Sequence, residues 1–161
     1  MTEAGPLRIH TAVVEPEWID YNGHVNDGYY VVGFTKATDA VQDLIGLDQA
    51  YREASGCSIY TVEAHLTYQR EVPPETPLAF ESWVLGVDAK RLHLFHRMLH
   101  ADEGWVAATH ELMLLHVDKV NGGVAPMPEA MVNQLSELRD AHAALERPTE
   151  IGSTFRPINS A

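Results

Sequence analysis

One long helical pattern, followed by a series of strand-like segments, restricts the folds open to this sequence more than any other feature. Between residues 26 and 46, mostly apolar positions recur at steps of three and four: Tyr30, Val31, Phe34, Ala37, Thr38, Val41, Leu44 and Ile45. This period predicts a helix with one broad apolar face. Asn26 is a suitable N-cap, acidic Asp27 follows it, and Gly46 is suited to the end of the helix.

The segments on either side of this helix have the composition of β-strands. Residues 8–14 form a β-branched run that closes at Pro16, which predicts the first strand. Later in the chain, two short breaks are typical of antiparallel hairpins. They separate three β-rich segments at 78–87, 91–100 and 105–117.

Residues 58–68 alternate in polarity, which predicts another strand. One side of this segment carries Tyr60, Val62, Ala64, Leu66 and Tyr68. The other side is polar and includes Glu63 and His65. We therefore expect one face of the strand to be packed and the other to stay polar.

A single amphipathic helix against one antiparallel sheet is an α+β arrangement, and a second, weaker helical pattern begins at Pro128. A chain of 161 residues fits one domain, which we place at 1–147, followed by a tail at 148–161. The outer face and the edge strand of such a sheet need covering. A homodimer or homotetramer is therefore expected.

Charge and cysteine content exclude several classes of function. The net charge is −12 and no cluster of Lys and Arg forms a basic stripe, which argues against nucleic-acid binding. The sequence shows no signal peptide and no apolar run long enough to span a membrane, so a cytoplasmic location without membrane contact is expected. Cys57 is the only cysteine, which rules out an intramolecular disulfide.

Reactive side chains are concentrated between residues 18 and 30, in the segment that leads into the long helix. Asp20 can act as a base or nucleophile, and Asn22 and His24 can bind it or orient a water molecule. The first turn of the helix, at Asp27 and Gly28, has backbone N–H groups that can stabilise charge on a thioester oxygen. The alternative is that these polar residues only shape a turn before a capped helix.

The run Asp20-Tyr21-Asn22-Gly23-His24-Val25-Asn26 resembles the D-x-N-G-H-x-N signature of hot-dog acyl-thioester hydrolases. Together with further matching segments, it is similar to the betainyl-CoA thioesterases of bacterial carnitine breakdown. These segments are Trp18 to His24, 61–65, 90–96 and 114–118, and the resemblance extends from about Arg8 to Pro128.

The resemblance implies a hot-dog fold, an acyl-CoA substrate, active sites at a dimer interface, and no metal or organic cofactor. It gives Asp20, Asn22 and His24 the catalytic positions of the family. A non-catalytic module that binds acyl-CoA is the alternative from another functional class, since a fold does not establish turnover. A dehydratase on the same fold is a third hypothesis.

Four aromatic side chains near Asp20 could form a cage for a quaternary ammonium group, or could simply pack around the start of the helix. They are Trp18, Tyr21, Tyr29 and Tyr30. A dimer that pairs the 58–68 strands could also bring Glu63 and His65 to a substrate site.

Contacts to the phosphates of coenzyme A are expected from Arg70, Lys90 and Arg91. No set of histidines matches a metal-binding spacing, so we interpret them as structural. Those considered are His93, His96, His110 and His116.

Overall fold

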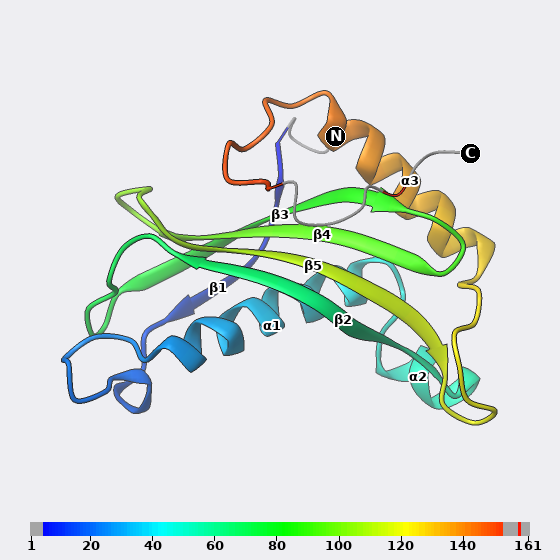
Figure 1. The fold of residues 1–161 in the computed structure, drawn as a ribbon, viewed down its shortest axis with the longest axis horizontal. Helices are drawn as coiled ribbons and strands as arrows, with labels where there is room; N and C mark the ends of the chain where they lie inside the picture. The colour runs from blue at the N-terminus through cyan, green and yellow to red at the C-terminus, as the bar shows by residue number, and fades with distance from the viewer. Residues whose placement is uncertain (1–4, 153–157, 159–161) are drawn as a thin grey trace.

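The computed structural model describes residues 5–152 and residue 158, which form one antiparallel sheet with helices on both sides (Figure 1). The strands are β1 (Leu7–Val13), β2 (Cys57–Tyr68), β3 (Pro77–Val87), β4 (Arg91–His100) and β5 (Val106–Asp118). The helices are the 3₁₀ turn η1 (Pro16–Trp18), α1 (Asp27–Leu44), α2 (Gln49–Ser55) and α3 (Glu129–Ala143). The strand order is β1-β3-β4-β5-β2, and the predicted α+β class is confirmed.

Helix α1 forms where its apolar period and its cap predicted it, and it lies against the inner face of the sheet. Asn26 caps it by accepting a hydrogen bond from Gly28 N–H. The ring of Phe34 packs edge-on against Phe80 of β3, with centroids 5.8 Å apart. A Cβ at Gly33 would lie 3.0 Å from side-chain atoms of both Phe80 and Met98, so these side chains would have to shift to admit a larger residue there.

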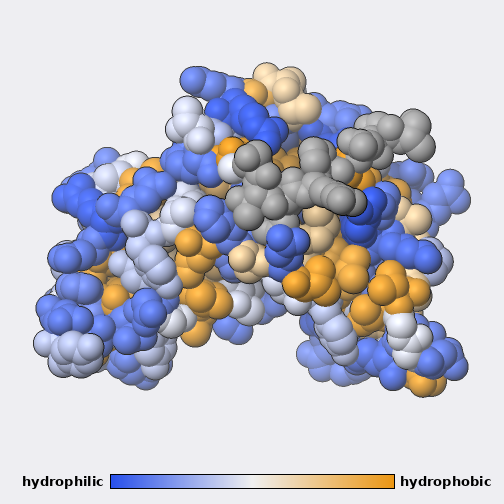
Figure 2. All heavy atoms as spheres, in the orientation of Figure 1, coloured by the Kyte–Doolittle hydropathy of each residue, from blue (hydrophilic) through white to orange (hydrophobic). Residues whose placement is uncertain are grey.

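Strand β2 is an edge strand, and most apolar side chains on the face that the alternation predicted to be packed are exposed in the single chain. Tyr60, Val62 and Tyr68 are 50%, 55% and 52% exposed, so the prediction of one packed face is wrong here. Two features account for this difference. Only β5 pairs with β2, and an irregularity between Thr61 and Glu63 interrupts the strict alternation of side chains. In the view of Figure 2, patches of hydrophobic residues lie between two ends of the molecule that are mostly hydrophilic.

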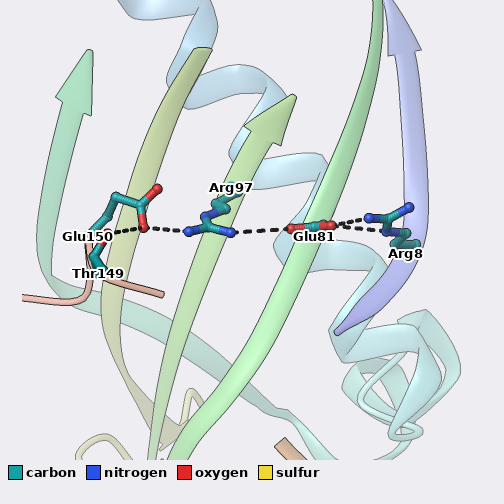
Figure 3. Close-up of polar contacts among 5 residues, drawn as sticks. All are labelled: Arg8, Glu81, Arg97, Thr149 and Glu150. Atoms are coloured by element: carbon teal, nitrogen blue, oxygen red, sulfur yellow. Dashed lines mark hydrogen bonds and ion pairs between the residues drawn. The ribbon is translucent and has the colours of Figure 1, made fainter. Parts of the chain in front are cut away.

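A row of alternating charges crosses the outer face of the sheet, on the side covered by α3 (Figure 3). Glu81 of β3 is bound by Arg8 of β1 and lies 3.9 Å from Arg97 of β4. Arg97 also donates a 2.5 Å hydrogen bond to Glu150. The four charges balance, and Glu81, the most deeply buried of them, has a guanidinium on each side.

The described part of the predicted tail lies against this outer face. Pro148 is buried, and Gly152 N–H donates a 3.2 Å hydrogen bond to the buried carboxylate of Glu111. His93 lies 2.9 Å from the other oxygen of Glu111. The remaining tail residues, apart from 158, lie outside the described part of the chain.

The short helix α2 was not predicted. Asp48 caps it by accepting from Tyr51 N–H, and Gly56 ends it with a φ of 69°. None of the helices in the described residues combines the length and apolar composition needed to cross a bilayer.

Candidate active site

The segment before α1 folds back on itself in a tight turn, and this turn positions Asp20. Asp20 N–H donates to the carbonyl of His24 at 3.1 Å, and Gly23 N–H donates to the carbonyl of Asp20 at 3.0 Å. Gly23 has a φ of 84°, a conformation that glycine adopts without strain. Asn26 N–H also donates to the carbonyl of Trp18, so the loop closes at its base.

The two carboxylate oxygens of Asp20 accept hydrogen bonds from different donors. Oδ1 accepts a 2.8 Å hydrogen bond from Asn22 N–H. Oδ2 lies 3.4 Å from the side-chain amide nitrogen of Asn26, which donates to it. Asn22 therefore contributes through its backbone, and Asn26 through its side chain.

The two predicted oxyanion donors differ in the structure. Gly28 N–H is already engaged by the side-chain oxygens of Asn26 and Asp27, each at 3.0 Å. Asp27 N–H has no hydrogen-bond partner among the described residues. Of the two predicted donors, the one left unpaired is therefore that of Asp27.

A cavity of about 470 Å³ opens at this point, between the loop, the start of α1 and the end of β2. It is lined by Asp20, Tyr21, Asn22, His24, Val25, Asn26, Asp27, Tyr30, Tyr68, Gln69, Arg70 and Glu71. The three predicted catalytic residues, Asp20, Asn22 and His24, therefore all line one cavity. The segment from Tyr68 to Glu71 is distant from them in sequence and lines the same cavity.

His24 points towards Glu71 and not towards Asp20. Its Nε2 lies 3.6 Å from a carboxylate oxygen of Glu71, and its Nδ1 lies 3.5 Å from the carbonyl oxygen of Val25. The predicted role of His24 in orienting a water molecule stays a prediction. In this geometry it would act from the wall of the cavity.

The four predicted cage aromatics do not surround one cavity. Trp18 and Tyr29 stack on each other with centroids 5.8 Å apart, and neither lines the hollow. Tyr21 and Tyr30 do line it, together with Tyr68, whose ring meets Tyr30 edge-on at 5.2 Å. The aromatic wall of the cavity is therefore Tyr21, Tyr30 and Tyr68.

Two of the three phenols in this wall, those of Tyr30 and Tyr68, act as hydrogen-bond donors. Tyr30 O–H donates to the carbonyl of Arg70, and Tyr68 O–H donates to the carbonyl of Asp27, both at 3.3 Å. Burial raises the pKa of both Tyr30 and Tyr68, so both stay protonated near neutral pH. Tyr68 thereby ties the end of β2 to the first turn of α1.

The predicted coenzyme A contacts are split between the two ends of the sheet. Arg70 lines the cavity and stacks over Trp105 at 4.2 Å. Lys90 and Arg91 lie at the β3–β4 turn, where Arg91 is paired with Asp88 at 2.7 Å.

Glu63 and His65 are exposed on β2, outside the residues that line the cavity. Their proposed contact with a substrate would therefore need a second copy of the chain.

Sequence reasoning missed Tyr68, Gln69 and Glu71 as part of the site. Tyr68 is the last residue of the alternating pattern of β2, and Gln69 and Glu71 follow it, before the prolines at 73 and 74. The pairing of β2 with β5 and direct hydrogen bonds to the loop bring this segment beside Asp20. Val25 N–H donates to the carbonyl of Val72 at 2.9 Å, and Tyr68 O–H donates to the carbonyl of Asp27.

Comparisons with known proteins agree with the fold and identify the family. Residues 14–135 match the model of the thioesterase-like superfamily. The betainyl-CoA thioesterase of Pseudomonas aeruginosa is 39% identical, over 91% of this chain and 92% of that protein. The L-carnitine dehydrogenase/betainyl-CoA thioesterase of Agrobacterium fabrum is 42% identical over 95% of this chain, which corresponds to 31% of that longer protein.

Two solved structures have the same fold. A Pseudomonas putida protein described as a candidate thioesterase superimposes with a TM-score of 0.79 at 35% identity, covering 94% of this chain and 96% of that one. A Staphylococcus aureus protein solved in complex with CoA gives a TM-score of 0.85 at 26% identity, with the same coverage of both chains.

Proposed function

The chain belongs to the thioesterase-like superfamily, and on this premise we propose that it hydrolyses betainyl-CoA to betaine and CoA. Membership makes the chain a thioester hydrolase, and the acyl group is the proposed part. The substrate named for its Pseudomonas and Agrobacterium relatives supports this choice. We assign the reaction to the cytoplasm, as the sequence predicted.

One observation supports the chemistry most directly: Asp20 and Asp27, whose N–H is unpaired among the described residues, line the same cavity. Hydrolysis needs a base or nucleophile at the thioester carbon and a donor at the thioester oxygen. Asp20 would supply the first and Asp27 N–H the second. The positive end of the α1 dipole adds to the stabilisation of negative charge at this oxygen.

Asp20 can act in two ways, and both give the same products. It can accept a proton from a water molecule whose oxygen bonds to the thioester carbon as the carbon–sulfur bond breaks. It can also attack that carbon itself, releasing the thiolate and forming a mixed anhydride that water then opens. A single turnover in ¹⁸O-water distinguishes them, because only the second route can leave ¹⁸O in the Asp20 side chain.

We also propose that two copies of the chain pair through β2 to form a homodimer. A homotetramer would consist of two such dimers. The edge of β2 offers unpaired backbone groups, and Tyr60 and Val62 are exposed beside them. An antiparallel pairing would put Tyr68 and the cavity of one copy near the start of its partner's β2. It would also bring Glu63 and His65 of both copies to the interface.

Light scattering tests the pairing. We expect a dimer or larger species for the native chain, and a shift towards monomer for Val62→Lys. Val120→Lys is the matched control, because Val120 is 76% exposed and lies in the loop after β5. A native monomer at micromolar concentration, or equal behaviour of the two variants, would exclude this interface.

The acyl group is tested with two thioesters that differ chiefly in charge, betainyl-CoA and isovaleryl-CoA. Each aromatic face stabilises a quaternary ammonium group by roughly 0.5 to 2 kcal/mol, and two or three faces of the cavity wall acting together should give about tenfold or higher kcat/KM for betainyl-CoA. Tyr68→Leu should reduce this ratio, whereas Tyr29→Leu, whose ring lies outside the cavity, should not. Equal kcat/KM values would reject betainyl-CoA, and no thiol release from any acyl-CoA would favour the non-catalytic binding module.

A further inference from the structure

A small hollow of about 150 Å³, which we call the α3 hollow, lies on the outer face of the sheet between β3, α3 and the segment that follows α3. Helix α3 and this segment lie on one side of the sheet, and α1 lies on the other (Figure 1). None of the residues that line it lines the Asp20 cavity, and none belongs to β2, the strand of the proposed interface. The α3 hollow is therefore separate from the reaction site.

Trp83 of β3 brings an unused donor to the α3 hollow. The residue is 4% exposed, and its indole Nε1 is buried with no hydrogen-bond partner in the described part of the chain. The guanidinium of Arg97 lies over its ring, 5.5 Å from the ring centre, and has no acceptor to offer. A buried N–H without an acceptor is costly, and it commonly marks a place that a ligand or an ordered water completes.

His142 of α3 supplies a second donor. Its Nδ1 accepts the N–H of Val84 at 2.8 Å, and the side chain is buried. Burial lowers the pKa of His142, so near pH 7 the ring is neutral and its one proton is on Nε2. Among residues 5–152 and 158, this Nε2–H has no hydrogen-bond acceptor.

Two arginines give the α3 hollow a positive charge. Arg147 has no ion-pair partner among the residues that the structure describes. Arg139 is paired only with its neighbour Asp140, at 2.9 Å. The described residues that line the hollow include no carboxylate, so its polar side chains offer donors and positive charge only.

The rest of the lining is apolar, and the space is small. The apolar residues are Val84, Leu85, Ala143, Leu145, Pro148 and Ile151. Because a water molecule takes up about 30 Å³ in the liquid, the hollow has room for a ligand of roughly five heavy atoms. A ligand that matches these walls has an anionic end that accepts hydrogen bonds and a short alkyl part.

We propose that the α3 hollow binds a short-chain monocarboxylate, with its carboxylate at Trp83, His142 and Arg147 and its alkyl group on Leu145 and Ile151. A carboxylate has acceptor sites for all three donors, and hydrogen bonds to an ionised acceptor are the stronger kind. The site does not depend on which thioester the enzyme hydrolyses.

Titration of propionate into the full-length ¹⁵N-labelled protein, in a buffer without carboxylate, tests the proposal. We expect a saturable shift of the NMR signal of the Trp83 indole N–H, which Trp83→Phe identifies by its loss. Arg147→Gln and Trp83→Phe should each weaken binding of propionate at least fivefold in calorimetry.

Two matched variants outside the α3 hollow should bind propionate like the native chain. Lys119→Gln removes a positive charge from an exposed position after β5. Trp105→Phe removes an indole N–H that already donates to Glu103 at 2.9 Å. Asp20→Asn should also bind normally, because the reaction site is not involved.

Two further ligands test the chemical class. Propylamine, which replaces the carboxylate with a cation, should not bind, and sulfate, which lacks the alkyl part, should bind at least fivefold more weakly than propionate. Equal binding of sulfate and propionate would reject the monocarboxylate. Absence of a saturable shift at Trp83, or native affinity in both Arg147→Gln and Trp83→Phe, would show that the hollow holds only water and would overturn the proposal.

Discussion

The side chain of Asn26 joins Asp20 to the first turn of α1. Its amide nitrogen lies 3.4 Å from Oδ2 of Asp20, and its oxygen accepts the Gly28 N–H at 3.0 Å. One residue therefore caps the helix and orients the carboxylate proposed to act at the thioester carbon. The position of Asp20 relative to the Asp27 N–H depends on this link.

Two substitutions at Asn26 separate capping from orientation. Serine and aspartate both cap helices well, so Asn26→Ser and Asn26→Asp should change stability by less than about 1 kcal/mol. Asn26→Asp places a second carboxylate beside Asp20 and removes the amide donor, which should lower kcat/KM about tenfold or more through repulsion of the developing oxyanion. Steady-state kinetics of both variants check this. Native activity in Asn26→Asp would show that the link has no catalytic role.

The ion pair between Arg97 and Glu150 predicts that the tail stabilises the sheet. Glu150→Gln leaves Arg97 with only Glu81 and should lower the free energy of unfolding by about 1 to 2 kcal/mol. Urea denaturation measures this change. Glu146→Gln, at an exposed position four residues earlier, should have no effect. Equal stability of the two variants would mean that the row of charges is stabilised without the tail.

Two histidines beneath α1 predict loss of stability in mild acid. Burial lowers the pKa of His96 to about 3 and that of His110 to about 4, from 6.5 in the unfolded chain. The unfolded state therefore binds more protons below pH 6.5, and stability falls as the pH decreases from there. Each histidine should cost about 2 kcal/mol at pH 5.

Denaturation at several pH values measures this dependence. His110→Gln should reduce the slope of stability against pH by about one proton. His65→Gln, at an exposed position, should leave it unchanged. A native chain that is as stable at pH 5 as at pH 7.5 would contradict the neutral, buried state of these two side chains.

The sequence was informative where local rules control the structure. The apolar period, Asn26 and Gly46 predicted α1, because capping and helical repeat act over a few residues. The hairpins β3–β4 and β4–β5 followed from their short breaks. The signature around Asp20 also predicted the family, which is confirmed by the match over residues 14–135.

Features that depend on distant contacts were not predictable in the same way. Trp18 and Tyr29 are near Asp20 in sequence, but they stack on each other because the loop closes between Trp18 and Asn26. Tyr68 enters the cavity through long-range contacts, namely the pairing of β2 with β5 and the hydrogen bond to the carbonyl of Asp27. The alternation of β2 predicted a packed face, but it could not show that the single chain leaves this face uncovered.

The most direct test of the central claim is thiol release by Asp20→Asn. The asparagine oxygen can still accept the Asn22 N–H, so the turn and the melting temperature should be retained. Without a carboxylate, kcat towards betainyl-CoA should fall at least about a hundredfold. Glu17→Gln, an exposed acid in η1, should keep full activity. Turnover by Asp20→Asn within a few-fold of the native chain would contradict the account.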